Sequence, residues 1–170
     1  MLDTAAFNAR ATFTWEADRL YRVCIEDGAL YFIRIGGQGG MNPAVAANFG
    51  LLGALVVGAA KSISERKRQE RLAAQEQQRP QDLLSAHKHN FRLSPSDVMD
   101  SSIEPAASAL SHGPNAGRWL LTQQDGKKWS LQFESVDDMQ AALEVLPVLF
   151  GSRLRVNVQW NEKKKRFERQ

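Results

Sequence analysis

Small residues recur at every fourth position in the most apolar stretch of this chain, and segments that predict β-strands lie on both sides of it. The recurring residues are Ala46, Gly50, Ala54, Gly58 and Ser62, in the run AVAANFGLLGALVVGAAKS. On a helix this spacing forms one smooth stripe along which a second backbone can approach closely. The stripe therefore predicts a close helix contact, with Phe49 at its flank.

The helical signal that contains this stripe runs from Pro43 to about Gln78. Pro43 suits the first position of a helix. At a rise of 1.5 Å per residue the helix is roughly 50 Å long, which is more than a compact domain of this size needs. We expect part of it to project, to bend or to pack on another chain.

The apolar half of this helix, residues 44–60, is shorter than the roughly 20 apolar residues that a simple membrane span needs. A single crossing also places the strands before and after it on opposite sides of a bilayer, where they cannot share one sheet. A basic flank follows the apolar half, made of Lys61, Arg66, Lys67, Arg68 and Arg71. We expect a packing helix in a soluble protein or at a membrane surface.

Strands dominate the first part of the chain. Residues 20–25 and 30–35 are rich in aromatic and β-branched side chains, and Glu26-Asp27-Gly28 between them predicts the turn of a hairpin. Residues 11–15 are expected to add a short strand or a cover over the sheet edge. Four glycines within residues 36–40 then predict a flexible hinge, because this loop lacks the spacing of a phosphate-binding motif.

The second part combines strands with one amphipathic helix. We expect a short helix or turn over 82–90, two short strands around a proline over 91–105, and a loop over 107–117. Residues 118–124 and 127–133 predict a hairpin around Asp125-Gly126. Ser135 is expected to cap a helix that ends at Gly151, followed by one amphipathic strand over 154–160 and a frayed or helical tail over 161–170.

The order of these segments resembles the pleckstrin-homology-like superfold in its bacterial and GRAM-type variants. The resemblance covers residues 20–36 and 87–151, through HKHNFRLSPSDVMDSSIEP, GRWLLTQQDGKKWSLQF and the helix SVDDMQAALEVLPVLFG. It implies an α+β fold: a pleckstrin-homology-like antiparallel β-barrel or sandwich with a C-terminal capping helix. The long inserted helix after the second strand and the strand after the capping helix depart from the family pattern.

This interpretation divides the chain into four parts. Residues 1–36 hold the first strands, 37–80 the glycine hinge with the inserted helix, 81–160 the remaining strands with the capping helix, and 161–170 a charged tail. The family resemblance implies a non-catalytic module that binds lipid head groups, peptides or other protein domains.

The composition of the chain limits the classes of partner and the cellular compartment that we expect for it. A net charge of +3 is too small to imply nucleic acid. The single cysteine, Cys24, cannot form an internal disulfide and fits a reducing compartment, and the first residues show no secretory signal. We expect a cytoplasmic protein, with association to a membrane as an option.

Candidate catalytic and metal-binding groups are sparse. His87, His89 and His112 could supply imidazole ligands, but no cysteine pair or carboxylate spacing accompanies them, so no metal site and no cofactor are expected. Cys24 is expected to be a small buried hydrophobe, and Asp137 with Asp138 to be acids at a helix start. The sequence therefore favours a protein that is not an enzyme.

Two functions remain open. The first is a module that self-associates, or binds a protein partner, through the helix stripe of Ala46, Phe49, Gly50, Ala54 and Gly58. The alternative is a peripheral protein on an anionic membrane, bound through the apolar helix and the flank of Lys61, Arg66, Lys67, Arg68 and Arg71. A second basic cluster, which nets +3 with Glu162 and Glu168, consists of Lys163, Lys164, Lys165, Arg166 and Arg169.

Overall fold

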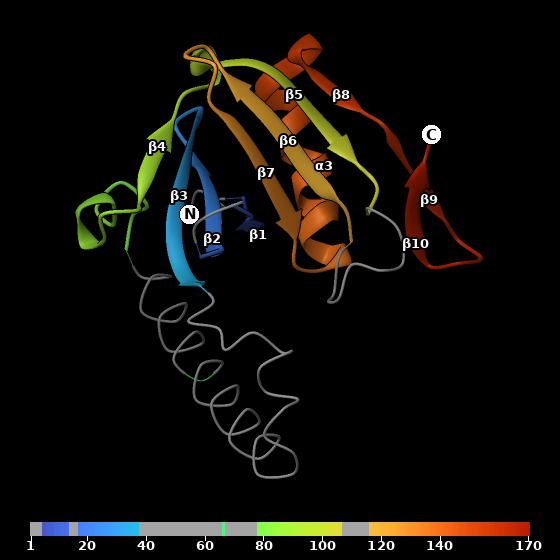
Figure 1. The fold of residues 1–170 in the computed structure, drawn as a ribbon, viewed down its shortest axis with the longest axis horizontal. Helices are drawn as coiled ribbons and strands as arrows, with labels where there is room; N and C mark the ends of the chain where they lie inside the picture. The colour runs from blue at the N-terminus through green and yellow to red at the C-terminus, as the bar shows by residue number, and fades with distance from the viewer. Residues whose placement is uncertain (1–4, 14–16, 38–65, 67–77, 107–115) are drawn as a thin grey trace.

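The computed structural model describes residues 5–13, 17–37, 66, 78–106 and 116–170. They form an eight-stranded sheet, one long α-helix near the C-terminus and a separate two-stranded sheet (Figure 1). The expectation of an α+β fold, with an antiparallel-rich sheet and a C-terminal helix, is confirmed. The closed barrel of that expectation is not seen among the described strands, whose sheet ends at β4 on one side and at β8 on the other.

The large sheet has the strand order β4-β3-β2-β1-β7-β6-β5-β8. Its strands are β1 (Ala6–Ala11), β2 (Arg19–Glu26), β3 (Ala29–Gly37), β4 (Phe91–Leu93), β5 (Val98–Glu104), β6 (Arg118–Gln123), β7 (Lys128–Phe133) and β8 (Leu154–Val156). These neighbours pair antiparallel, except β5 and β8, which pair in parallel. The small sheet pairs β9 (Val158–Asn161) with β10 (Arg166–Arg169).

Helical segments connect and cover these strands. The α-helix α3 spans Val136–Phe150, and three short 3-10 helices span Leu84–Ala86 (η1), Pro95–Asp97 (η2) and Gly151–Arg153 (η3). Among the residues that the structure describes, no helix combines the length and the apolar character that a membrane span requires.

Both predicted hairpins are confirmed. Between β2 and β3, Asp27 and Gly28 have φ of 50° and 70°, so both central residues of the turn are left-handed. This two-residue geometry matches the twist of the strands that it joins. The hairpin of β6 and β7 turns through Asp125 and Gly126, where φ at the glycine is 84°.

The core lies inside the strongly curved sheet. Phe91 of β4 stacks on Trp129 of β7 at 5.0 Å between ring centroids, although these strands are not neighbours in the sheet. Trp119 is fully buried and its indole N–H donates to Ser101 Oγ at 2.7 Å. The buried face of α3, formed by Met139, Ala142, Leu146 and Phe150, belongs to the same cluster.

The capping helix begins and ends as predicted. Ser135 Oγ accepts from the backbone N–H of Asp138 at 3.0 Å, and Gly151 ends the helix with φ of 54°. Asp138 also binds outside the helix, because its Oδ1 accepts from the backbone N–H of Asn8 in β1 at 2.6 Å. This bond fixes the start of α3 against the centre of the sheet.

The prediction for the first strand was wrong in place. We expected a short strand or an edge cover over 11–15, of which residues 14 and 15 lie outside the described residues. The strand that the structure shows, β1, spans Ala6–Ala11 and pairs with both β2 and β7. The strand forms there because Phe7, Ala9 and Ala11 alternate with polar residues and are all buried.

The prediction for the end of the chain was also wrong. Residues 154–160 form two strands, and the tail over 161–170 contains β10 instead of being frayed or helical. The division occurs at Asn157, whose N–H donates to Ile103 of β5 while its carbonyl accepts from Gln170 after β10. The chain therefore leaves the large sheet and enters the small sheet at this residue.

Candidate functional site

The predicted insertion connects two neighbouring strands. The chain leaves the sheet at the end of β3 and returns to it at β4, and Phe32 and Phe91 of these strands are paired in register. Strands from before and after residues 38–77 therefore share one sheet. Both flanks of the insertion lie on the same side of any membrane, as the topological argument from the sequence requires.

The segment that returns from the insertion packs on the outer face of β2 and β3. Leu83 is buried there in a small cluster with Cys24, Tyr31 and Ile33. Asn90 fixes the segment at both ends, because its Nδ2 donates to the Leu83 carbonyl at 2.7 Å and its Oδ1 accepts from the Arg34 N–H at 2.8 Å. The base of the insertion is thus held by both apolar and polar contacts.

Positive charge gathers at this base. Arg34 Nη1 lies 2.9 Å from His87 Nε2, and the rings of His87 and His89 are 5.3 Å apart. The pKa of His89 lies below its usual value, first because of partial desolvation and then because Arg19, Lys88, His87 and Arg34 are near. A cationic neighbourhood of this kind attracts anions. We name Arg19, Arg34, Lys88, His87 and His89 the basal cluster.

An aromatic group adjoins the basal cluster at the same end of the sheet. Phe13 packs edge-on against Trp129 at 5.9 Å between ring centroids. Arg19 lies over the ring of Phe13 at 4.6 Å, and Lys127 lies over the ring of Trp129 at 4.4 Å. Such cation–π contacts hold the two positive charges against the core.

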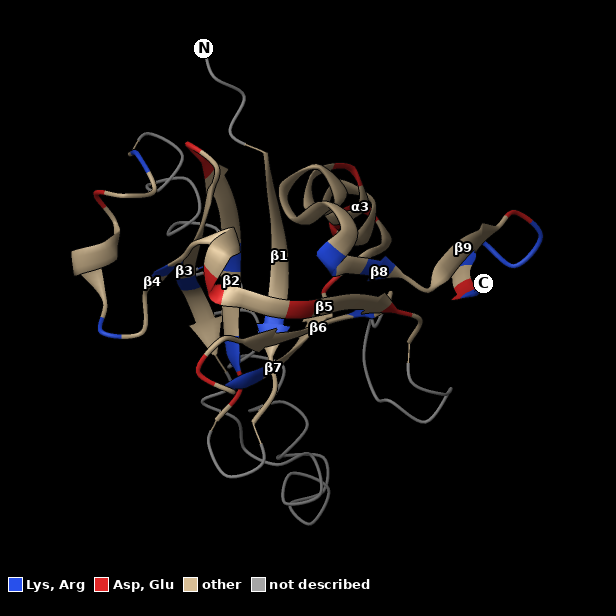
Figure 2. Ribbon diagram, turned by 90° about the horizontal axis from the view of Figure 1, so that it is seen from above, with Lys and Arg blue, Asp and Glu red and all other residues tan. Residues whose placement is uncertain are grey.

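A second charged surface is the C-terminal hairpin of β9 and β10. Inside it the rings of Trp160 and Phe167 are 5.1 Å apart, and Phe167 belongs to the main core cluster. The turn between the strands contains Glu162, Lys163, Lys164 and Lys165, all of them exposed. Figure 2 shows this turn as a mostly blue loop that stands away from the sheet.

One carboxylate organises the cations of this hairpin. Glu168 accepts from Lys164 Nζ at 2.8 Å, from Arg166 Nη2 at 2.8 Å and from Asn161 Nδ2 at 2.8 Å. These hydrogen bonds lower the pKa of Glu168 to about 2. The bond from Lys164 has the largest effect, followed by those from Arg166 and Asn161. Because one carboxylate serves two cations, the hairpin keeps an excess of positive charge.

Comparison with protein-family models, with curated proteins and with solved structures found no match for this chain.

Of the predicted site residues, the structure describes Arg66, which is helical and exposed. The other members of the stripe and of the basic flank lie outside the described residues; they are Ala46, Phe49, Gly50, Ala54, Gly58, Lys61, Lys67, Arg68 and Arg71. The proposed contact through the stripe therefore stays a prediction, and so does the length of the inserted helix.

The remaining candidates can be placed individually. Cys24 is buried as predicted, and burial raises the pKa of its thiol. His87 and His89 lie together, whereas His112 lies outside the described residues. Within the described ranges no three side chains of His, Cys, Asp or Glu are grouped as a metal ion requires.

Sequence reasoning missed the basal cluster and the C-terminal hairpin as structures. In the basal cluster, Arg19 lies on β2, Arg34 lies on β3 and Lys88 follows the insertion. Because these residues are far apart in the sequence, no local pattern predicts the cluster. The hairpin had a local signal: Phe167 is the one apolar residue in a charged run and alternates with Arg166 and Glu168. That alternation is typical of a strand with one covered face.

Proposed function

We propose that this protein is a non-catalytic, pleckstrin-homology-like interaction module that self-associates through its inserted helix. The order of elements supports the family assignment: a first hairpin, two short strands around a proline, a second hairpin around Asp125-Gly126 and a helix over the sheet. The Ala46, Gly50, Ala54 and Gly58 stripe supplies the surface for a second copy of the chain.

The observation that carries this proposal is the anchoring of the insertion at both ends. Its entry strand β3 and its exit strand β4 are adjacent, and Leu83 and Asn90 hold the returning segment on the sheet. A segment anchored in this way loses less freedom when it binds a partner than a segment on a loose tether. The sheet therefore acts as a rigid platform for residues 38–77.

Light scattering tests the self-association. We expect the wild-type chain to have at least twice the 19.0 kDa mass of one chain, and the Gly50→Leu/Gly58→Leu variant to approach that single mass. Leucine at these positions separates the backbones that the stripe brings together. The matched control is Ala47→Leu/Ala59→Leu, which places the same side chains off the stripe and keeps the wild-type mass. An unchanged mass in the stripe variant contradicts the proposal.

A second candidate function is binding to an anionic membrane surface. The basal cluster favours it, because its cations, Arg19, Arg34 and Lys88, lie where the insertion joins the sheet. The insertion itself contributes its apolar half and its flank of Lys61, Arg66, Lys67, Arg68 and Arg71. Flotation with vesicles tests this function. We expect the protein to float with vesicles that contain anionic lipid; failure to float with either anionic or neutral vesicles removes this candidate.

A further inference from the structure

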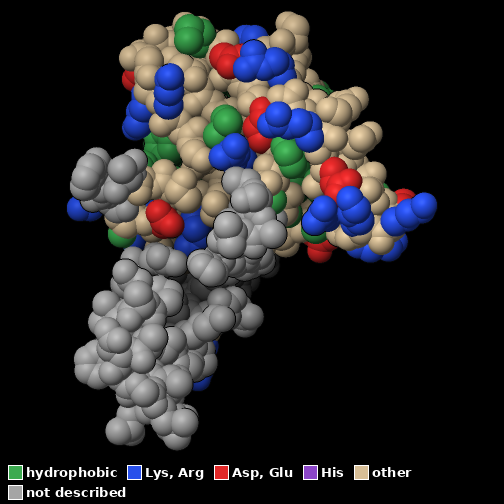
Figure 3. Space-filling view, turned by 45° about the vertical axis from the view of Figure 1, so that its right-hand side comes forward, with side chains coloured by type: hydrophobic (Ala, Val, Ile, Leu, Met, Phe, Trp, Pro, Cys, Tyr) green, Lys and Arg blue, Asp and Glu red, His purple; other side chains and the backbone are tan. Residues whose placement is uncertain are grey.

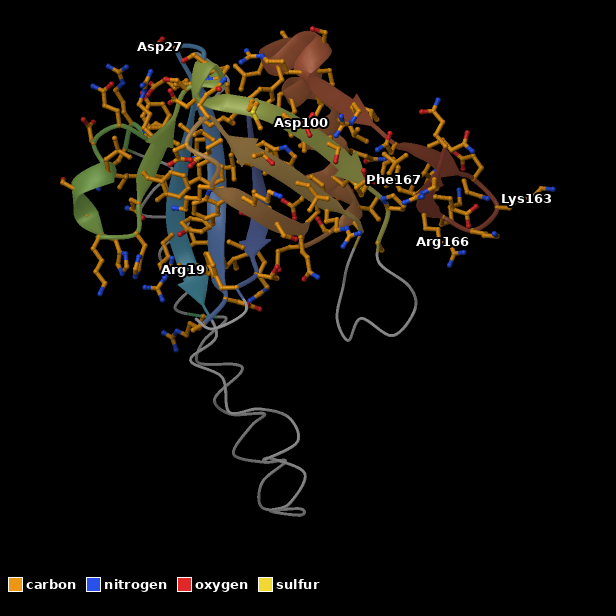
Figure 4. The ribbon with its side chains drawn as sticks, turned by 45° about the horizontal axis from the view of Figure 1, so that its top comes forward. Arg19, Asp27, Asp100, Lys163, Arg166 and Phe167 are labelled. Carbon is orange, nitrogen blue, oxygen red and sulfur yellow. The ribbon has the colours of Figure 1, made fainter. Side chains whose placement is uncertain are left out.

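The turn of the C-terminal hairpin concentrates positive charge on one projection. Within residues 161–170 five cations stand against two carboxylates, a net charge of +3. Three of the cations, Lys163, Lys164 and Lys165, are consecutive in the turn. Lys163 lies at the outer end of the hairpin and its side chain points away from the sheet (Figure 4). We name these three residues the lysine tip.

The hairpin is held firmly at its base. Phe167 and Val158 are buried in the main core cluster. Glu104 of β5 accepts from Asn157 Nδ2 at 2.6 Å and lies 3.6 Å from Arg169 Nη2. The lysine tip is therefore presented at a fixed place on the molecule, and blue side chains interrupted by red ones mark this side in Figure 3.

The charges of the tip are available to a partner. Lys164 pairs with Glu168 and Lys165 with Glu162, both at 2.8 Å, but the two lysine side chains are 55% and 74% exposed. Exposed ion pairs of this kind contribute little to stability, so a lysine can exchange its carboxylate for an external anion.

The type of cation indicates the type of anion. Recognition of carboxylates in a peptide favours the planar fork of arginine. The turn of this hairpin presents three lysines instead, and its arginines, Arg166 and Arg169, lie on the strand β10. Lysines on a projecting turn act as point charges and suit a flat surface with many phosphates. A membrane also needs no groove for its contact.

We propose that the lysine tip binds anionic phospholipid head groups and is a membrane contact of this protein, separate from the inserted helix. This inference rests on the second candidate function, binding to an anionic membrane surface, and names one contact that carries it. Each lysine near an anionic surface contributes about a five-fold factor to binding. Together the three lysines contribute about 100-fold.

Sedimentation of the full chain with vesicles tests the inference. The vesicles contain either phosphatidylcholine alone or phosphatidylcholine with about one third phosphatidylserine. We expect binding to the anionic vesicles, a loss of about 100-fold in Lys163→Gln/Lys164→Gln/Lys165→Gln, and wild-type binding in the variant with arginine at the same positions. The control Arg79→Gln/Arg92→Gln/Lys128→Gln removes three cations elsewhere and retains most of the binding.

The outcomes of this experiment distinguish the role of the lysine tip from membrane binding by the protein as a whole. If the wild type binds neither vesicle, both the second candidate function and the lysine tip are overturned. If the wild type binds and the two glutamine variants lose binding equally, membrane binding stands and the tip is overturned in favour of net charge. If the wild type sediments with immobilised poly-glutamate instead of with vesicles, the partner is an acidic protein segment. If the tip variant keeps its binding and aggregates, the lysines protect a sheet edge instead.

Discussion

Some residues in this protein form contacts with residues that are distant in the sequence, and the local sequence does not predict these contacts. Ser135 and Gly151 at the two ends of α3 follow from local rules, and so does the burial of Cys24 in an apolar strand. Asp138 was predicted as an acid of the helix start, and it has that role. Its second bond, to the backbone N–H of Asn8, reaches a residue far back in the chain and needs the folded sheet before it can be seen.

The two acids at this helix start allow a matched comparison. Asp137 and Asp138 both lie near the positive end of the helix dipole, but only Asp138 also forms hydrogen bonds with Asn8 of β1 and with the Ser135 hydroxyl. We expect Asp138→Ala to lower the free energy of unfolding by about 2 kcal/mol, because the Asn8 N–H and the Ser135 hydroxyl lose their acceptor. Asp137→Ala removes only the dipole contribution, about 0.5 kcal/mol. Thermal or urea unfolding of both variants measures the difference, and equal losses contradict the role of Asp138.

At the scale of elements, the long periodic segments and the two strands around Pro95 were predicted correctly, whereas the short paired strands at the end of the chain were not. The α3 helix and the two hairpins carry their own periodicity and turn residues, so their sequence was sufficient. β8 and β10 are three and four residues long and exist because β5 and β9 supply their hydrogen-bond partners. A charged run such as the tail is ambiguous until its partner strand is known.

The C-terminal hairpin depends on the charge of Glu168. Its pKa of about 2 in the folded chain lies below the usual value of 4.5, so the ionised form favours the folded hairpin. This contribution is complete above about pH 4.5 and is lost as the pH falls toward 2. We expect the Glu168 carboxyl signal in NMR to titrate near pH 2 in the wild type.

The double variant Lys164→Gln/Arg166→Gln serves as the control for this titration. It removes the two cationic donors to Glu168, so the midpoint should move up toward the usual value of a glutamate. A wild-type midpoint close to 4.5 contradicts the network at Glu168.

At the scale of the whole molecule, the described residues pack together into a core, to which Leu83 of the segment that returns to β4 contributes. Both clusters of buried side chains consist of residues on the strands, on α3 and on the segments next to them. The sequence predicted the α+β class because strand and helix patterns alternate along it. It did not predict the strand order, in which the first strand pairs with the seventh, because non-local pairing leaves no local signal.

This arrangement predicts that the insertion can be removed. Replacing residues 38–77 with a short Gly/Ser linker joins two strands that are already adjacent, and a shorter loop costs less entropy to close. We expect the variant to keep the β-sheet signal in its far-ultraviolet circular dichroism spectrum and to unfold cooperatively. Light scattering should report a single chain, since the stripe is gone. A variant without cooperative unfolding contradicts the independence of the core.

The central position of β1 also affects how the chain comes to be folded. β1 is synthesised before the other strands of the sheet, yet its pairing with β7 joins Ala9 to Phe133 and must wait until β7 has been synthesised. Until then one edge of β1 is unpaired and Phe7 lacks its ring contacts with Trp119 and Phe133. Pairings so distant in sequence slow folding and lengthen the time in which apolar strands are open to wrong partners. The strand that unites the finished sheet is thus the one most exposed to error while the protein is being made.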